Sequence, residues 1–302
     1  MELTIFAGKG GVGKTTSAVS LALYLSSVEK VAIIDYDGGH SVSSSLGLKN
    51  VEPNKIISVD DKLSIGVIES VSFYPITTFD EKDRSVKYLD QFQEDFGIVA
   101  FSDMINEFFG VPTDIASVQK FILLVRMITE LEEKGFRKVI IDVEPTAGLE
   151  RLLLNSNSML RSLRNLKSKS KLLQVAVSVT WPDIARFLKS DYVKNIDLHT
   201  KKIEIVVDML LQSKYVLVCT PEKSPVSQSF EVRKIIENFG GKIHGYVVNN
   251  LRDESHEDAQ LQIIRTQGYP MAEIKRYAIM QSSSSPKTTL LFIGSRINEI
   301  FK

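Results

Sequence analysis

The chain has 302 residues, enough for the core of one large α/β domain, and its 37 basic and 37 acidic side chains balance. This balance excludes a general electrostatic attraction to nucleic acid or anionic membranes, and the single cysteine, Cys219, excludes an internal disulfide and a thiolate-cluster metal site. We expect a cytoplasmic protein, because the sequence shows no signal-peptide pattern and no run of about 18 apolar residues.

Apolar, β-branched runs alternate with helical patterns along the chain. The first run, Leu3–Ala7, ends in a glycine loop, and Thr15–Ser26 has the apolar period of a helix. Further buried strands are predicted at residues 31–35, 139–142, 215–219 and 246–248, and further helices at residues 118–133 and 226–238. This alternation predicts a doubly wound α/β fold, with a mostly parallel sheet and helices on both of its faces.

Two stretches interrupt the alternation and are predicted to be mainly helical insertions, at about residues 79–134 and 150–212. We expect them to form a helical subdomain within a single domain of residues 1–302, because no linker or repeat divides the chain. The second insertion carries a basic stretch, Arg161–Lys171, whose simplest interpretation is a solvated helix end.

The segment Gly8–Thr15 matches the pattern G-x-x-x-x-G-K-[ST] between a predicted strand and a predicted helix, which is the context of a P-loop. Its glycines allow backbone N–H groups to converge on phosphate oxygens, and the following helix adds the positive end of its dipole. Lys14 is expected to bridge the β- and γ-phosphates, Thr15 to bind Mg²⁺ and Thr16 to reach the α-phosphate. The sequence therefore predicts a Mg²⁺-dependent P-loop nucleotide hydrolase, whose expected nucleotide contacts are Gly10, Gly11, Val12, Gly13, Lys14, Thr15 and Thr16.

Carboxylates follow two of the predicted strands, at the sheet edge where α/β proteins bind ligands. Asp142 follows one of them and is expected to hold Mg²⁺ through water. After the second strand either Asp35 or Asp37 is a candidate, and Asp37 at the loop tip would position the attacking water unless it is an ordinary turn aspartate. Lys9 is a cation inside the glycine loop and needs an anion to face, either its own nucleotide or one across an interface.

Three segments together resemble the deviant Walker A ATPases, in the branch of arsenite-pump ATPases and tail-anchored-protein targeting ATPases: Lys9–Thr16, Asp37–Ser43 and Asp142–Leu153. The second segment, D-G-G-H-S-V-S, is similar to the family's switch I loop, D-P-A-H-S-L-S. The third keeps the Asp, Pro, Thr, Arg and two leucines of its switch II loop. The resemblance implies ATP as the nucleotide, Asp37 as the aspartate that positions water, and adenine contacts from Asn249, with Pro221 and Glu222 nearby.

The same resemblance implies a homodimer in which Lys9 reaches the partner's nucleotide, so that Lys9, Lys14 and Asp37 form the catalytic set. It also implies a client protein, such as a hydrophobic transmembrane helix, that binds and leaves with the nucleotide state. Membrane contact is then expected only through a client or receptor, and nucleic-acid binding is not expected. The chain departs from the family because it has no C-x-x-C pair for zinc, no set of cysteines for arsenite, and an altered switch II at Glu144 and Ala147-Gly148.

Other functions remain open at this point. A partitioning or positioning ATPase of the same superfamily would bind DNA or membrane through Arg161–Lys171. A GTPase or small-molecule kinase would use the same loop, but no N-K-x-D guanine signature occurs. A nucleotide-binding scaffold with little turnover would follow if the altered switch II prevents hydrolysis. Apolar residues in the second insertion either bind a client helix or pack the subdomain: Leu152–Leu154, Met159, Leu160, Leu163 and Leu172–Trp181.

Overall fold

The computed structural model of the chain describes residues 1–69, 115–143, 146–161, 164, 196–252, 254–276 and 286–302. The chain divides into two compact units. The first contains Met1–Glu69, Arg126–Leu153 and Asp208–Lys302, and the second contains Ser70–Val125 and Leu154–Val207. The described strands and the glycine loop all belong to the first unit, which therefore holds the predicted nucleotide site.

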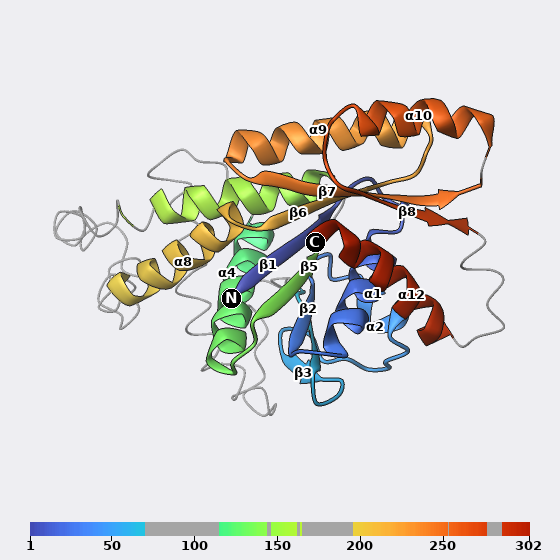
Figure 1. Ribbon diagram of the computed structural model, residues 1–302. Coiled ribbons are helices and arrows are strands. Elements are labelled where there is room, and N and C mark those ends of the chain that lie inside the picture. Colours follow the sequence, from blue (N-terminus) through green and yellow to red (C-terminus); the bar gives the residue numbers. More distant parts are fainter. Residues whose placement is uncertain (70–114, 144–145, 162–163, 165–195, 253, 277–285) are drawn as a thin grey trace, which may run out of the picture. The chain divides into compact units, whose positions relative to one another are not determined.

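The first unit is built on a mostly parallel sheet (Figure 1). Its described strands lie in the order β3, β4, β2, β5, β1, β6, β7 and β8, and β3 runs antiparallel to β4 while the other neighbours are parallel. The strands are β1 (Glu2–Ala7), β2 (Val31–Asp35), β3 (Ile56–Ser58), β4 (Leu63–Val67), β5 (Lys138–Asp142), β6 (Lys214–Cys219), β7 (Lys242–Leu251) and β8 (Met271–Lys275). This sheet confirms the predicted α/β fold of the P-loop type.

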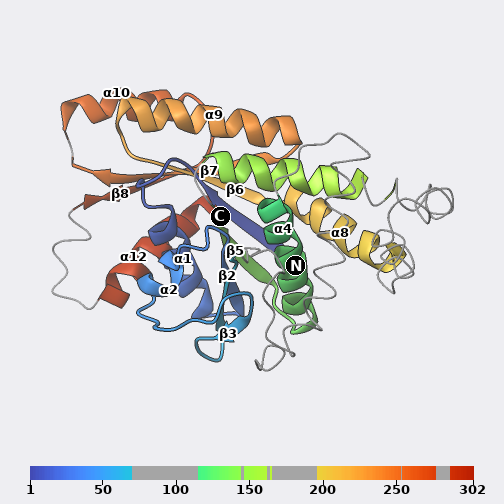
Figure 2. The same cartoon turned by 180° about the vertical axis from the view of Figure 1, so that it is seen from behind.

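Helices cover both faces of this sheet, as Figures 1 and 2 show from opposite sides. Helices α1 and α12 pack together on one face, and α9, with α10 beside it, packs on the other. A β-carbon on Gly294 of α12 would lie 2.1 Å from the Ser20 carbonyl oxygen of α1, so glycine permits the close approach of these two helices. The described helices are α1 (Lys14–Ser26), α2 (Ser41–Ser45), α4 (Ile115–Glu133), residues 146–161, α8 (Ile196–Leu211), α9 (Lys223–Phe239), α10 (Ser255–Arg265), α12 (Pro286–Asn298) and the short 3₁₀ helix η1 (Glu299–Phe301).

The burial of the strands explains why some of them are predicted from the sequence and others are not. All five residues of β2 are buried, and β1, β5 and β6 are buried except at their first residue, so each presents an apolar run with no polar alternation. Strand β4 is also fully buried, but Ser64 and Gly66 interrupt its apolar run, and the strand is not predicted from the sequence. Strand β7 extends well beyond the three apolar residues that predict it.

The apolar cluster of the second insertion is mostly buried where it is described. Leu152, Leu153, Met159 and Leu160 are at most 9% exposed, whereas Leu154 is 59% exposed. Burial favours packing rather than client binding for those four side chains. The other predictions for the insertions concern Leu163, Leu172–Trp181 and residues 79–114 and 165–171, which lie outside the described residues. None of the described helices has the length and apolar character needed to cross a membrane.

Candidate nucleotide site

The strand order brings the three predicted site loops to one edge of the sheet. Strand β5 lies between β2 and β1, and Asp142 at its end pairs in register with Asp35 on one side and Phe6 on the other. The glycine loop follows β1 directly, and the β2–α2 loop (Tyr36–His40) follows β2. Asp142 therefore lies between the two loops, at the carboxyl edge where open α/β sheets bind their ligands.

The glycine loop has a conformation that its glycines make possible. Gly11 and Gly13 have φ values of 80° and 94°, in the left-handed region, and a β-carbon on Gly8 would lie 2.2 Å from the Val218 carbonyl oxygen. Gly13 is the N-cap of α1, so no side chain caps the first turn of that helix, which also contains no acidic residue. The amino end of α1 thus retains backbone donors and a positive dipole end for an anion, as the phosphate-binding prediction requires.

Lys14 is the first residue of α1 and its ammonium group is buried at the loop. Its Nζ donates to the Lys9 carbonyl oxygen at 3.1 Å, and the residue is 8% exposed. Burial lowers the pKa of Lys14, and the nearby carboxylates of Asp142 and Asp37 oppose this effect. A cation in such surroundings gains from an additional anion, which is the expected role of the nucleotide phosphates.

Thr15 and Asp142 are joined directly. The Thr15 hydroxyl donates to Asp142 Oδ2 at 2.5 Å, and Asp142 is 1% exposed. The other carboxylate oxygen, Oδ1, is buried without a hydrogen-bond partner among the described residues. Burial, and to a smaller extent the charges of Asp35 and Asp37, raises the pKa of Asp142 to about 6, although the Thr15 hydrogen bond and Lys14 oppose this.

These oxygen atoms fit a hard divalent cation. A hydroxyl and a carboxylate are ligands that Mg²⁺ accepts, and Mg²⁺ usually keeps several of its waters. A buried carboxylate oxygen that lacks a partner is costly, and a metal-bound water would donate to it. Thr15 and Asp142 are therefore suited to hold Mg²⁺, with Asp142 acting through water.

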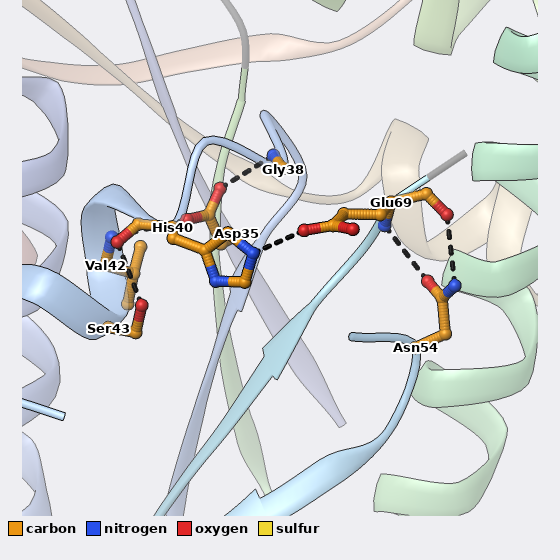
Figure 3. A network of polar contacts seen from close by, with 7 residues as sticks. All are labelled: Asp35, Gly38, His40, Val42, Ser43, Asn54 and Glu69. Atoms are coloured by element: carbon orange, nitrogen blue, oxygen red, sulfur yellow. Dashed lines mark hydrogen bonds and ion pairs between the residues drawn. The ribbon is translucent and has the colours of Figure 1, made fainter. Parts of the chain in front are cut away.

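The two candidate aspartates at the carboxyl end of β2 have different surroundings. Asp35 is fully buried, and its carboxylate accepts from the backbone N–H groups of Gly38 at 3.0 Å and Val42 at 3.3 Å (Figure 3). Burial raises the pKa of Asp35, and these two hydrogen bonds oppose that rise. Asp37 is exposed, and its charge acts on Lys14 and Asp142. Asp35 therefore holds the β2–α2 loop in shape, and Asp37 is the carboxylate that an incoming ligand can reach.

Lys9 is exposed at the outer side of the glycine loop. Its Nζ lies 3.5 Å from the Ser224 hydroxyl oxygen in the same chain. A weak contact of this length leaves the ammonium group available for a stronger anionic partner.

Asn249 lies near the end of β7, and its predicted neighbours Pro221 and Glu222 lie in the loop between β6 and α9. The Asn249 side-chain amide donates to the Val12 carbonyl oxygen at 3.0 Å, and a β-carbon on Gly13 would lie 2.2 Å from its Nδ2. Asn249 therefore supports the glycine loop from behind, a contact that the sequence does not indicate. Pro221 is buried, and Glu222 is exposed at the N-cap of α9. Thr16 is partly exposed in the first turn of α1, and Glu144 lies outside the described residues.

Cys219 ends β6 and is fully buried. Burial, with a smaller contribution from Glu222, raises the pKa of its thiol to about 12. The sulfur therefore stays protonated near neutral pH, which makes it a poor ligand for metals or metalloids.

Two contacts in the site involve residues to which the sequence analysis assigned no individual role. Ser41, in the first turn of α2, places its hydroxyl 3.4 Å from that of Thr15. His40, just before it, is hydrogen-bonded to Glu69, whose backbone is in turn bound by Asn54 (Figure 3). Glu69 follows the apolar stretch that contains β4, and Asp142 is the last residue of β5, so a carboxylate at the end of a buried apolar run is the signal that could have revealed Glu69.

Known proteins share sequence similarity with this chain over most of its length. The sequence profile of the anion-transporting ATPases matches residues 1–275. The chain is 25% identical over 263 residues to a protein of Aquifex aeolicus (strain VF5) described as an arsenical pump-driving ATPase, in a match covering 85% of this chain and 83% of that protein.

Two eukaryotic relatives extend the comparison. The chain is 23% identical to the ATPase GET3C of Arabidopsis thaliana, covering 86% of this chain and 70% of that protein. It is 25% identical to the ATPase ASNA1 homolog of Plasmodium berghei (strain Anka), covering 81% of this chain and 61% of that protein. The chain thus spans less than two thirds of the length of the last of these three relatives.

Proposed function

This chain belongs to the anion-transporting ATPase family and is an ATPase, and from that premise we propose that it is a Mg²⁺-dependent, dimeric switch that binds and releases a client protein. The observation that carries the proposal is the meeting of Thr15, Asp142 and Ser41 beside the glycine loop. Through these contacts, a ligand bound at the loop reaches the β2–α2 loop, which is the element that would change with the nucleotide state.

Each residue of the site has a distinct part in this proposal. The amino end of α1 and the Lys14 ammonium group bind the phosphates, and Lys14 compensates the negative charge that develops during transfer. Thr15 and Asp142 hold Mg²⁺, which offsets charge on the phosphate oxygens when it is bound. Asp37, exposed at the loop tip, orients the attacking water. Asn249 keeps the loop in place through Val12 and lies at the edge where the adenine would bind, near Pro221 and Glu222.

Two substitutions separate binding from hydrolysis. Lys14→Ala removes the buried cation and should abolish ATP binding, measured by isothermal titration calorimetry, together with turnover. Asp37→Asn leaves the phosphate cradle intact, so it should retain ATP and lose hydrolysis by about a hundredfold or more. Asp61→Asn, which removes an exposed carboxylate from another loop, is the matched control and should hydrolyse ATP normally. Normal turnover in Asp37→Asn would show that this aspartate has no part in the reaction.

The exposure of Lys9 supports a dimer in which its ammonium group reaches the nucleotide of the partner subunit. A heterodimer of Lys9→Ala and Lys14→Ala subunits would contain one complete site, because the Lys9→Ala subunit binds ATP and its partner supplies Lys9. Mixing the two inactive variants should therefore restore part of the ATPase activity. The control mixture pairs Lys14→Ala with the Lys9→Ala/Lys14→Ala double variant and should stay inactive. Strict monomers in the presence of ATP, by analytical ultracentrifugation, would contradict the proposal.

The second compact unit supports a hydrophobic helix as the class of client. Among the described residues of this unit, three large apolar side chains are exposed: Leu154 at 59%, Leu198 at 54% and Ile205 at 41%. Exposed apolar residues of this kind are typical of surfaces that bind an amphipathic or apolar helix. The Asp37→Asn variant with ATP should bind a fluorescent apolar-helix peptide, and adding Leu198→Ser or Ile205→Ser to this variant should weaken the binding. Phe292→Ser, which alters a 52% exposed residue of the first unit, is the control and should bind normally.

A further inference from the structure

The β2–α2 loop is held by a glutamate that lies outside the nucleotide-binding motifs. His40 has a φ of 53°, a left-handed value that is uncommon for a residue with a side chain. Its carbonyl oxygen accepts from the Ser43 hydroxyl at 2.9 Å, and its Nε2 is hydrogen-bonded to Glu69 Oε1 (Figure 3). An ionised carboxylate can only accept, so Nε2 carries a proton and donates to Glu69. The conformation of the loop at His40 thus depends on Glu69.

The backbone of Glu69 is bound in turn by one side chain. The Asn54 amide accepts from the Glu69 N–H and donates to the Glu69 carbonyl oxygen, both at 3.0 Å. The Asn54 N–H also donates to the Val67 carbonyl oxygen at 2.7 Å. Because both the N–H and the carbonyl oxygen of Glu69 are hydrogen-bonded to Asn54, the backbone of Glu69 is fixed, and its side chain is held toward His40.

Asn54 has a further partner, Arg126 on α4. Arg126 Nη2 donates to the Asn54 carbonyl oxygen at 2.5 Å. Glu69 and Arg126 flank the first excursion of the chain out of the first unit, because the stretch Met1–Glu69 ends at Glu69 and the next stretch of this unit begins at Arg126. Asn54 is therefore hydrogen-bonded to the two residues of the first unit that flank the segment Ser70–Val125.

We propose that Glu69 is a positioning residue for the β2–α2 loop, and that Asn54 and Arg126 extend this contact to both connections of the segment Ser70–Val125. We call His40, Glu69, Asn54 and Arg126 the Glu69 network. The inference rests on the proposed nucleotide switch and names the residues through which a conformational change at the nucleotide site would reach this segment. A ligand at the glycine loop acts on Asp37 through its charge and on Ser41 through Thr15. His40 lies between Asp37 and Ser41 in the chain and is hydrogen-bonded to Glu69. By thermodynamic reciprocity, a partner that alters either connection would also alter nucleotide affinity.

The side chain of Glu69 can be changed without touching the Asn54 contacts, which involve only its backbone. Glu69→Ala should lower kcat for ATP about tenfold to a hundredfold, because the loop that carries Asp37 loses its support, with little change in KM. Glu69→Gln keeps an oxygen acceptor for His40 and should recover most of the rate. Glu273→Ala removes a glutamate of similar exposure, 32% against 38% for Glu69, from an ion pair with Arg265 and is the control.

Hydrogen exchange with mass spectrometry tests the route itself. In the wild type, a non-hydrolysable ATP analogue with Mg²⁺ should slow exchange about fivefold or more in peptides covering residues 35–45, 54–69 and 126–133. In Glu69→Ala, and separately in Asn54→Asp, the analogue should still bind and protect residues 35–45, while protection at residues 126–133 is lost. Aspartate at position 54 tolerates the local φ of 60° but cannot donate to the Glu69 carbonyl.

The outcomes distinguish this inference from the proposed function. If the analogue changes nothing at residues 35–45 of the wild type, the nucleotide switch itself is wrong. If it protects residues 35–45 but not 126–133 in the wild type, or if protection at 126–133 persists in both variants, the Glu69 network does not transmit the change. A fall in kcat that Glu69→Gln fails to recover would likewise remove the positioning role.

Discussion

Replacing Asp142 by asparagine should change how the stability of the protein depends on pH. Asp142 is 1% exposed, and burial, followed by the charges of Asp35 and Asp37, raises its pKa from 3.8 to about 6. Between about pH 4 and pH 6 the folded protein therefore binds more protons at this carboxyl than the unfolded chain does. The free energy of unfolding falls as the pH rises through that window, and the contribution of protonated Asp142 is fully present only below it.

The size of the effect follows from the two pKa values. The difference between 3.8 and about 6, at about 1.4 kcal/mol for each pKa unit, corresponds to about 3 kcal/mol of stability lost above pH 6. In Asp142→Asn this dependence disappears, because the amide does not titrate. The amide oxygen can still accept from Thr15, and the cost of its buried NH₂ group does not vary with pH.

Urea unfolding of both proteins, followed by circular dichroism at steps from about pH 4.5 to pH 7.5, measures this contribution. The samples contain EDTA and no nucleotide, so that ligand binding does not alter the folded state. Relative to the wild type, the variant should gain about 2 kcal/mol across this range, because about 1 kcal/mol of the total is already lost at pH 4.5, where the unfolded carboxyl is largely ionised. Asp61→Asn, at an exposed position, is the control for the loss of one carboxylate. A constant difference for Asp142→Asn, or one with the opposite sign, would refute the reasoning.

Three further predictions concern packing and chemistry. Gly13→Ala should weaken ATP binding at least about tenfold, by calorimetry, because its β-carbon would lie 2.2 Å from Asn249 Nδ2, whereas Gly11→Ala, which meets no atom within 4 Å, should weaken it less. Gly294→Ala should lower the free energy of unfolding by about 1–3 kcal/mol in urea titrations, and an unchanged midpoint would contradict the close packing of α1 and α12. Cys219 should resist iodoacetamide in the folded protein and react once the protein is denatured, because the thiol is fully buried with a pKa of about 12; mass spectrometry would detect early labelling if this is wrong.

Much of the first unit follows from local sequence patterns. Strands β1, β2, β5 and β6 are buried on both faces, so their apolar runs are continuous and easily recognised. Strand β4 is equally buried but contains Ser64 and Gly66, and Gly66 leaves room for the Met127 sulfur, which would lie 2.9 Å from a β-carbon there. The need for glycine at position 66 comes from its packing against α4, and this contact between distant residues cannot be predicted from the local sequence pattern.

The features of the glycine loop can be predicted from local sequence. Its conformation comes from left-handed glycines, its donors come from the start of α1, and its cation is Lys14, all within one short segment. The roles of Asp35 and Asp37 required the tertiary structure, because both lie within two residues of the end of the same strand, β2. Burial and two backbone donors make Asp35 structural, whereas exposure leaves Asp37 accessible.

The sequence by itself determined the α/β fold and predicted a phosphate-binding loop, because both rest on residues that are adjacent in the chain. Tertiary structure decided which distant residues complete the site. The placing of β5 between β2 and β1 brings Asp142 to Thr15, and the end of β7 brings Asn249 to Val12. The Glu69 network likewise joins residues 40, 54, 69 and 126, whose proximity depends on strand order and on the fold of α4 rather than on any spacing in the sequence.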